Sequence, residues 1–130
     1  MTDCVFCDRI HNDGAQLSFD GDHFVAFPDR FPVNSGHTLV VPRNHVSRLR
    51  NCEPSIREEL PHVITKVQDQ LERTHAPDGF NVGINEGEMA GQTIDHFHVH
   101  VIPRYEGDVD DPEGGVRGVI PDKQSYRDGC

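Results

Sequence analysis

The stretch DHFHVHVIP, residues 95–103, decides the fold because it alternates histidine with apolar residues. His96, His98 and His100 fall at every second position, and a β-strand points alternate side chains to opposite faces. We therefore predict a strand with three imidazoles on one face, each roughly 6–7 Å from the next. The apolar residues between the histidines point to the other face, where burial in a core sets the register.

A row of imidazoles on a strand predicts a functional site rather than a packing role. Imidazole can act as a nucleophile, a proton carrier or a metal ligand near neutral pH. A proton on one ring disfavours a proton on its neighbours, so the rings tend to stay neutral. A neutral ring keeps a lone pair for attack on phosphorus or for a metal. The alternative is a histidine-rich surface strand without a function.

The chain before this stretch predicts further strands. Residues 16–20 and 23–27 have strand composition around a Gly21-Asp22 turn, which predicts a β-hairpin. Short strands are expected at 37–41 and 80–85. Together with the histidine strand, they indicate a mostly antiparallel sheet.

One main helix is expected between these strands. From Pro54 to Leu71, apolar residues follow at helical spacing and form one stripe. Pro61 conflicts with a continuous helix, so we expect a kink, or a short first helix with the main helix beginning near Leu60. One helix packed on an antiparallel sheet predicts an α+β fold.

A glycine-containing loop, residues 86–92, leads into the histidine strand. Glycines let backbone N–H groups approach an anion closely, and Gln92 and Thr93 add neutral donors. The loop thus predicts a phosphate site that needs no positive charge. The alternative is a loop of ordinary turn residues.

The composition excludes some function classes. The 130 residues suit one domain, and a net charge of −10 argues against a nucleic-acid groove. No apolar run is long enough to span a membrane and no signal-peptide pattern is present, so we expect a soluble, cytoplasmic protein. Asp outnumbers Glu by 14 to 8, which suggests a halophilic source, with an ordinary acidic bacterial enzyme as the alternative. A protein fully stable and active without salt would contradict the halophilic origin.

Two of the four cysteines, Cys4 and Cys7, have the spacing of a motif. In a cytosolic chain, this spacing favours metal binding or redox chemistry over a disulfide framework. Zinc needs two further ligands from elsewhere in the chain. The alternative is a pair of reduced, partly buried thiols.

Several segments together resemble one family. The stretch GQTIDHFHVHVIPR, residues 91–104, resembles the signature of the histidine triad (HIT) proteins. The resemblance extends to CVFC at 4–7, AFPD at 26–29 and SGHTLVVP at 35–42. Within the family, the motifs AGQT at 90–93 and IPR at 102–104 are most similar to the dinucleoside polyphosphate hydrolase (fragile histidine triad-like) branch. The resemblance implies a histidine triad fold: about five antiparallel strands, one main helix, a short N-terminal helical turn and a homodimer.

The resemblance also implies catalytic roles. His98 would attack the α-phosphorus of a nucleotide and form a nucleotidyl-histidine intermediate, which water would then hydrolyse. His100 would stabilise charge on the transferring phosphate, and His37 would support both from a neighbouring strand.

Substrate-binding residues follow from the same resemblance. Gln92 and Thr93 would hold phosphate or leaving-group oxygens, and Asp29 would contact the ribose hydroxyls. Further expected contacts are Phe6 and Phe27 in the base pocket and Asn85 near the nucleotide. Ordinary core positions remain the alternative for the two phenylalanines, and a turn-forming role remains the alternative for Asp29.

A structural zinc ion is the cofactor that the resemblance implies. His45 and His96 would complete a site with Cys4 and Cys7, in which His96 binds the metal while the other two triad histidines act on substrate. Mg²⁺ is expected only as part of a polyphosphate substrate.

The interpretation is therefore a single histidine triad domain over residues 1–130, with an acidic, glycine-rich tail at 105–130. We expect a nucleotide hydrolase that prefers a dinucleoside polyphosphate and has no nucleic-acid or membrane partner. A nucleoside phosphoramidase and a nucleotidyl transferase or phosphorylase of the same family remain alternatives. A zinc-dependent module that binds nucleotides without turnover is the alternative from another class.

Overall fold

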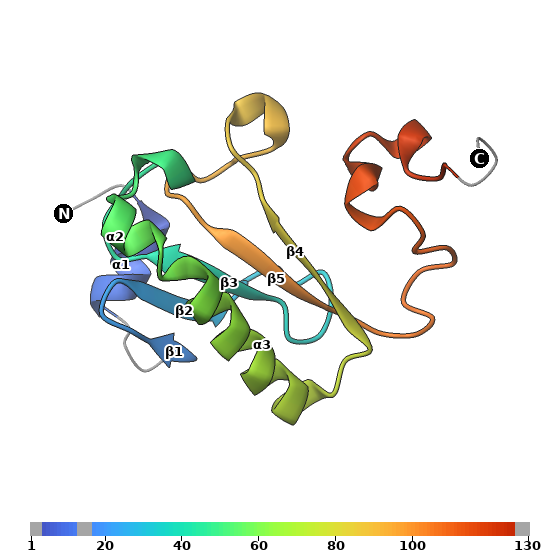
Figure 1. The fold of residues 1–130 in the computed structure, drawn as a ribbon, viewed down its shortest axis with the longest axis horizontal. Helices are drawn as coiled ribbons and strands as arrows, with labels where there is room; N and C mark the ends of the chain where they lie inside the picture. Colours follow the sequence, from blue (N-terminus) through green and yellow to red (C-terminus); the bar gives the residue numbers. More distant parts are fainter. Residues whose placement is uncertain (1–3, 13–16, 127–130) are drawn as a thin grey trace.

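The computed structural model describes residues 4–12 and 17–126. Five antiparallel strands form one sheet in the order β1-β2-β3-β5-β4 (Figure 1). Their bounds are β1 Phe19–Asp20, β2 Phe24–Pro28, β3 Thr38–Pro42, β4 Gly79–Ile84 and β5 Val99–Arg104. The helices are α1 Val5–Asn12, α2 Pro54–Arg57 and α3 Leu60–His75. This architecture confirms the predicted α+β fold with one main helix.

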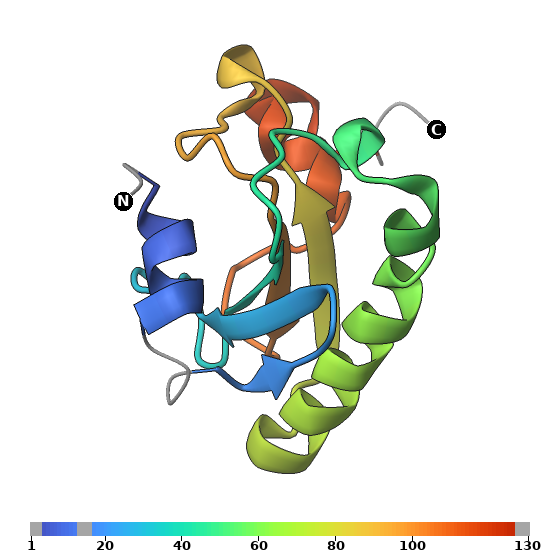
Figure 2. The same cartoon turned by 90° about the vertical axis from the view of Figure 1, so that its left-hand side faces the viewer.

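The two faces of the sheet are covered by different helices. Figure 2 shows α1 and α3 on opposite sides of the strands. The buried face of α3 packs on one side against alternate strand residues, among them Val40, Val99 and Val101. On the other side, Phe6 and Ile10 of α1 lie in a second apolar cluster. The period-two alternation of β2, β3 and β5 therefore supplies two cores, since successive residues of these strands face α3 and α1 in turn.

The helical segment is interrupted as Pro61 predicts. A short α2 ends at Arg57, and α3 begins at Leu60, which places Pro61 in its first turn. Proline is tolerated there because the first N–H groups of a helix have no intrahelical acceptor. The helix ends at His75 and is capped by Ala76, whose φ of 48° is left-handed.

The predicted histidine strand is shorter than expected, and this corrects the interpretation of the triad. β5 begins at Val99, so His96 and His98 precede it and only His100 lies within it. Val99 is the first residue of the strand, and it pairs with Val40 on β3 and with Ile84 on β4. Before Val99, Phe97 N–H donates to Val46 O at 2.6 Å. The backbone of residues 96–98 therefore bonds to the loop after β3 and not to a neighbouring strand.

Other boundaries differ from prediction by a few residues. Of the first predicted hairpin strand, residues 16–20, only Phe19–Asp20 pairs with a neighbouring strand, and Gln16 lies outside the described residues. β3 begins one residue after His37, and β4 spans Gly79–Ile84 rather than 80–85. Within the tail, 3-10 helices form at 115–119 and 121–123, and Figure 1 shows this part beyond the edge strand β4. No helix in the described part of the chain is both long and apolar enough to cross a membrane.

Candidate active site

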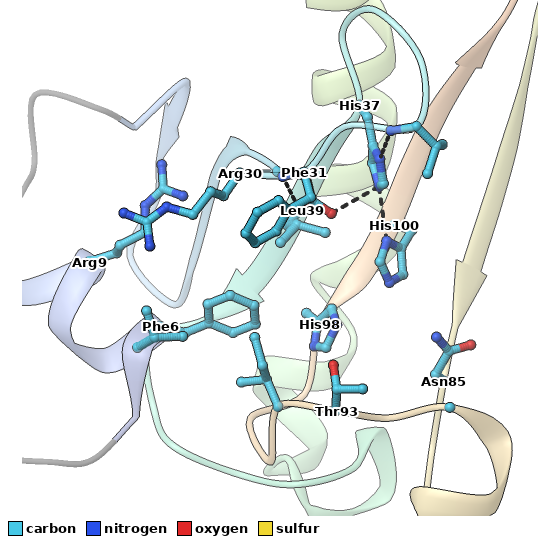
Figure 3. Close-up of a pocket in the computed structure, with 15 residues that line it drawn as sticks. Phe6, Arg9, Arg30, Phe31, His37, Leu39, Asn85, Thr93, His98 and His100 are labelled. Atoms are coloured by element: carbon cyan, nitrogen blue, oxygen red, sulfur yellow. Dashed lines mark hydrogen bonds and ion pairs between the residues drawn. The ribbon is translucent and has the colours of Figure 1, made fainter.

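A cavity of about 440 Å³ opens beside the triad histidines on the α1 side of the sheet (Figure 3). His98 and His100 lie at its base, where β5 begins. The remaining walls come from α1, from the loop after β2, from β3 and from the loop before β5. The lining residues that these elements supply are Val5, Phe6, Arg9, Asp29, Arg30, Phe31, Val33, His37, Leu39, Asn85, Gly91, Thr93 and Ile94.

The hydrogen bonds of His98 define which ring nitrogen is available. Its Nδ1 lies 2.9 Å from the carbonyl oxygen of His96, and a carbonyl can only accept. Nδ1 therefore has the proton in the neutral ring, and Nε2 keeps a lone pair. The ring packs edge-on against Phe6 with a centroid separation of 5.0 Å and is 7% exposed. A fixed, largely buried imidazole with a lone pair on Nε2 can act as a nucleophile.

A chain of hydrogen bonds orients His37 and His100. Val33 N–H donates to His37 Nδ1 at 3.1 Å, so Nε2 of His37 is the protonated nitrogen. That Nε2 lies 2.9 Å from His100 Nδ1 and 3.4 Å from a carboxylate oxygen of Asp29. His100 Nδ1 thus accepts, which leaves its proton on Nε2. The pocket therefore combines a lone pair on His98 with an N–H donor on His100.

Both supporting histidines are biased toward the neutral form. Burial, with smaller contributions from the neighbouring His98 and His37, lowers the pKa of His100 to about 4, although the carboxylate of Asp29 opposes the shift. Burial also lowers the pKa of His37, although the carboxylate of Asp29 opposes the shift. Neutral rings keep the hydrogen-bond chain intact at physiological pH, because a protonated His100 could not accept at Nδ1.

These shifts predict a loss of stability in mild acid. An unfolded histidine takes up its proton near pH 6.5, whereas His100 in the fold does so only near pH 4. Between these values the unfolded state binds more protons, so the free energy of unfolding falls as the pH falls from 6.5 toward 4. Urea unfolding at pH 7.5 and pH 5 measures this loss. His100→Asn should show a smaller loss than the wild type, and an equal loss would contradict the assignment.

The predicted substrate residues divide into two groups. Asp29, Asn85 and Thr93 line the cavity. Gln92 does not, because its side chain is bonded to backbone: Oε1 accepts from Gly87 N–H at 2.8 Å, and Nε2 donates to Ser47 O at 3.0 Å. Gln92 therefore shapes the loop before β5, whereas a phosphate contact was expected.

The two predicted base-pocket phenylalanines also separate. Phe6 lines the cavity. Phe27 does not, and it is 0% exposed within the α1-side core, where its ring packs edge-on against Phe6 at 5.5 Å. The expected base contact of Phe27 is therefore corrected in favour of the core position that was its alternative. On β2 its side chain points under α1 rather than toward the opening.

The four predicted metal ligands come together beside the pocket. One ligand atom each from Cys4, Cys7, His45 and His96 lies within 4.8 Å of the others. Nδ1 of His96 lies 3.4 Å from Cys4 Sγ and 3.5 Å from Cys7 Sγ, and Nδ1 of His45 lies 3.4 Å from Cys7 Sγ. In a tetrahedral zinc site with ordinary bond lengths, sulfur and nitrogen ligands lie about 3.6 Å apart.

The protonation of His96 also suits a metal. Its Nε2 lies 2.8 Å from Pro42 O, so that nitrogen donates and Nδ1 keeps its lone pair toward the cysteines. The side chain is 0% exposed, and burial lowers its pKa. The donor set and its spacing therefore fit a structural zinc ion.

One structural network was missed by the sequence interpretation, which placed Asp108 in an acidic, glycine-rich tail without a structural role. Arg104 Nε and Nη2 each donate to Asp108 at 2.8 Å. Asn34 Nδ2 donates to the same carboxylate at 2.7 Å, and Tyr105 Oη donates to Ser35 O at 2.7 Å. The network ties the loop after β2 to the end of β5. A four-residue separation suggests an ion pair only within a helix, whereas Arg104 ends β5 and the turn from Tyr105 to Asp108 brings the pair together.

Removing this carboxylate should destabilise the fold. The guanidinium of Arg104 holds the pKa of Asp108 well below its usual range, and Tyr105 N–H adds a further hydrogen bond. We expect Asp108→Asn to lower the Tm measurably, because it removes the charge that Arg104 faces. Asp110→Asn, an exposed change of the same charge, is the matched control. Equal Tm values for the two variants would contradict the prediction.

The HIT domain family matches residues 12–107. An uncharacterized HIT-like protein of Methanocaldococcus jannaschii is 40% identical over 108 residues, which are 81% of this chain and 81% of the relative. A crystal structure of a HIT family member from Bacillus subtilis has a TM-score of 0.76 at 32% identity, with 82% of this chain and 77% of that chain covered. A zinc-bound histidine triad protein from Mycobacterium smegmatis has a TM-score of 0.73 at 30% identity, with 98% and 96% covered.

Two longer relatives have names that state an activity. A bis(5'-nucleosyl)-tetraphosphatase of Schizosaccharomyces pombe is 38% identical over 95 residues, or 73% of this chain and 52% of the relative. An adenylylsulfatase of Arabidopsis thaliana is 33% identical over 109 residues, or 83% of this chain and 55% of the relative. The matched part is thus about half the length of these two proteins.

Proposed function

The chain belongs to the HIT domain family, and on that premise we propose that it is a nucleotide hydrolase that cleaves at the α-phosphate. His98 Nε2 attacks the α-phosphorus, and the bond from phosphorus to the leaving group breaks. Water then attacks phosphorus, the phosphorus–nitrogen bond breaks, and a nucleoside monophosphate leaves. The single observation that supports this role most strongly is the 2.9 Å contact of His98 Nδ1 with His96 O, which keeps Nε2 free of a proton.

His100 and His37 serve the transferring phosphate in this proposal. The Nε2–H of His100 donates to a phosphoryl oxygen, and His37 fixes the orientation of His100 through the 2.9 Å hydrogen bond between them. Thr93 and Asn85 add neutral donors at the same cavity. Neutral donors suit an anion in a chain whose net charge is −10.

The nucleoside end of the substrate is assigned to the α1 side of the pocket. Asp29 Oδ1 accepts from Phe31 N–H at 2.9 Å, while Oδ2 lies at the cavity near His37. A carboxylate in this position accepts hydrogen bonds from ribose hydroxyls. Phe6, which also lines the cavity, provides an aromatic surface for the base.

Zinc is proposed as a structural cofactor bound by Cys4, Cys7, His45 and His96. When bound, it would tie α1 to the segment before β5. The relative from Mycobacterium smegmatis is zinc-bound, which supports the assignment. Because Phe6 lies between two of the ligands in sequence, the site would also position one wall of the substrate pocket. Mg²⁺ belongs to the polyphosphate substrate in this scheme.

A dinucleoside polyphosphate is the proposed first-choice substrate, supported by the tetraphosphatase relative. The adenylylsulfatase relative favours a second candidate, an adenylylated compound with a different leaving group. The phosphoramidase and the transferase or phosphorylase of the same family share the covalent step and differ in the leaving group or the acceptor. A nucleotide-binding module without turnover is the candidate that needs no nucleophile.

We propose one histidine triad domain over residues 1–130, a homodimer, and a cytoplasmic location. Val82 and Ile84 on the edge strand β4 are 40% and 38% exposed, and Val116 and Val119 of the tail are 67% and 74% exposed. Exposed apolar residues of this kind support contact with a second subunit.

A substrate panel tests the proposed function. The panel contains diadenosine tri- and tetraphosphate, adenosine phosphoramidate, adenylyl sulfate and a nucleotide sugar, each followed by chromatography of the products. We expect adenosine monophosphate from at least one of them, with the highest kcat/KM for a dinucleoside polyphosphate. Nucleotide binding without turnover of any compound would instead support the binding module.

A further inference from the structure

Two arginines of the pocket have no role in the reaction just described. Arg9 of α1 and Arg30 of the loop after β2 both line the cavity. Over residues 4–12 and 17–126, neither forms an ion pair with a carboxylate, although the chain is strongly acidic. We propose that Arg9 and Arg30 read the edge of the nucleotide base and select a 6-oxopurine, guanine or hypoxanthine, over adenine. This inference rests on the proposed function, because it assumes a nucleotide in this cavity.

Arg9 is held in place against the pocket wall. The carbon at the centre of its guanidinium lies 4.1 Å from the ring centroid of Phe27, and Nη1 donates to Pro28 O at 3.2 Å. Phe27 is part of the core, so the surface under Arg9 is rigid. A guanidinium has five N–H donors, and this bond uses one. The proposed reaction uses none of the remaining donors of Arg9. They are therefore available to a ligand.

The order of side chains along the pocket determines what these donors meet. In Figure 3, the rings of Phe6 and Phe31 lie between His98 and the end of the pocket toward which Arg9 and Arg30 extend. Asn85 and Thr93 lie on the other side of His98. The aromatic side suits a base, and the polar side suits a leaving group.

A nucleotide fits this order in one direction. With its α-phosphorus at His98 and its ribose at Asp29, the base lies among the two phenylalanine rings and its far edge reaches the arginines. Arg30 directly follows Asp29 in sequence, which keeps the base-edge group close to the ribose group. The phosphate chain of the substrate extends away from both arginines.

The chemistry of guanidinium then discriminates between purines. Guanidinium only donates, and it pairs with the adjacent O6 and N7 acceptors of guanine. Hypoxanthine presents the same two acceptors. Adenine presents an amino donor in place of O6, which leaves a donor facing a donor. The rival occupant is a further phosphate attached to the ribose, since phosphate also accepts from arginine.

Equilibrium binding of three nucleoside monophosphates tests the inference without any need for turnover. Titration calorimetry with GMP, IMP and AMP should give a Kd for GMP and for IMP about fivefold or more below that for AMP, the lower end of what a bidentate arginine contact provides. Arg30→Met removes an exposed side chain and should reduce the ratio of the Kd for AMP to the Kd for GMP. R9M/R30M should bring it close to one, with its Tm measured to check the fold. Arg73→Met, which removes an exposed positive charge on α3, is the matched control and should keep the ratio.

Each contrary result overturns the inference in a defined way. Equal or tighter binding of AMP overturns it, as does a ratio that survives in R9M/R30M. A preference for GMP that IMP does not share would assign recognition to the 2-amino group instead. Tighter binding of adenosine 3',5'-bisphosphate than of GMP would assign the arginines to phosphate. A base preference in a protein that hydrolyses no nucleotide would overturn the proposed function alone, and hydrolysis without a base preference would overturn this inference alone.

Discussion

His98→Ala should reduce nucleotide hydrolysis by at least about 10⁴-fold, because removing a nucleophile leaves only binding and electrostatic contributions to the rate. The loss should lie in kcat. The ring of His98 is only 7% exposed and packs against the rings of Phe6 and His100, so nucleotide affinity should change little. Steady-state kinetics on the best substrate of the panel, with calorimetry of nucleotide binding, measures both quantities.

Two further variants separate the loss of the nucleophile from damage to the fold. His98→Asn keeps a donor that can reach the His96 carbonyl and should be as inactive as His98→Ala. His62→Ala removes an exposed histidine from α3 and should keep full activity. Loss of a group that only positions the substrate would leave roughly a few per cent of the wild-type rate. If His98→Ala retains that much or more, His98 is not the nucleophile.

Cys7→Ser should abolish zinc binding and cause the largest loss of stability among the proposed variants. A ligand bound only by the folded state and present at a thousandfold its Kd stabilises by about 4 kcal/mol, and this contribution disappears with the site. Cys7 is buried, and its Sγ lies close to the Nδ1 atoms of both His45 and His96. Metal analysis should find about one zinc ion per wild-type chain and almost none in the variant.

The effect on the pocket should follow from the position of the site. Loss of zinc would loosen α1, which contributes Phe6 to the cavity, so KM should rise more than kcat falls. Cys52→Ala removes another buried thiol, from the α3-side core, and should keep the zinc content of the wild type. Wild-type protein purified without chelator and free of zinc would refute the metal site.

Much of the fold could be predicted because its signals are local. The alternation in 95–103 indicated which residues face a core, and Phe97, Val99 and Val101 are indeed 0% exposed. Pro61 predicted the interruption before α3. The start of β5 could not be predicted, because it depends on where β3 and β4 stop pairing rather than on residues 96–98 themselves.

The site was predictable in its ligand types and less so in its geometry. The Cys-x-x-Cys spacing indicated metal binding or redox chemistry, and the family resemblance implied His45 and His96 as the other two ligands. The structure brings those four side chains together. Gln92 and Phe27 show the limit. Whether a loop glutamine faces a ligand or the backbone, and which side of a two-sided sheet a phenylalanine faces, depends on packing between distant segments.

The most direct test of the central proposal is detection of the covalent intermediate. After rapid mixing with the best substrate and quenching, mass spectrometry of the digested protein should find a nucleotidyl group on the peptide that contains His98, with fragmentation placing it on that residue. His98→Ala should show no adduct. Turnover with no adduct at any quench time, or an adduct on a different side chain, would contradict the account.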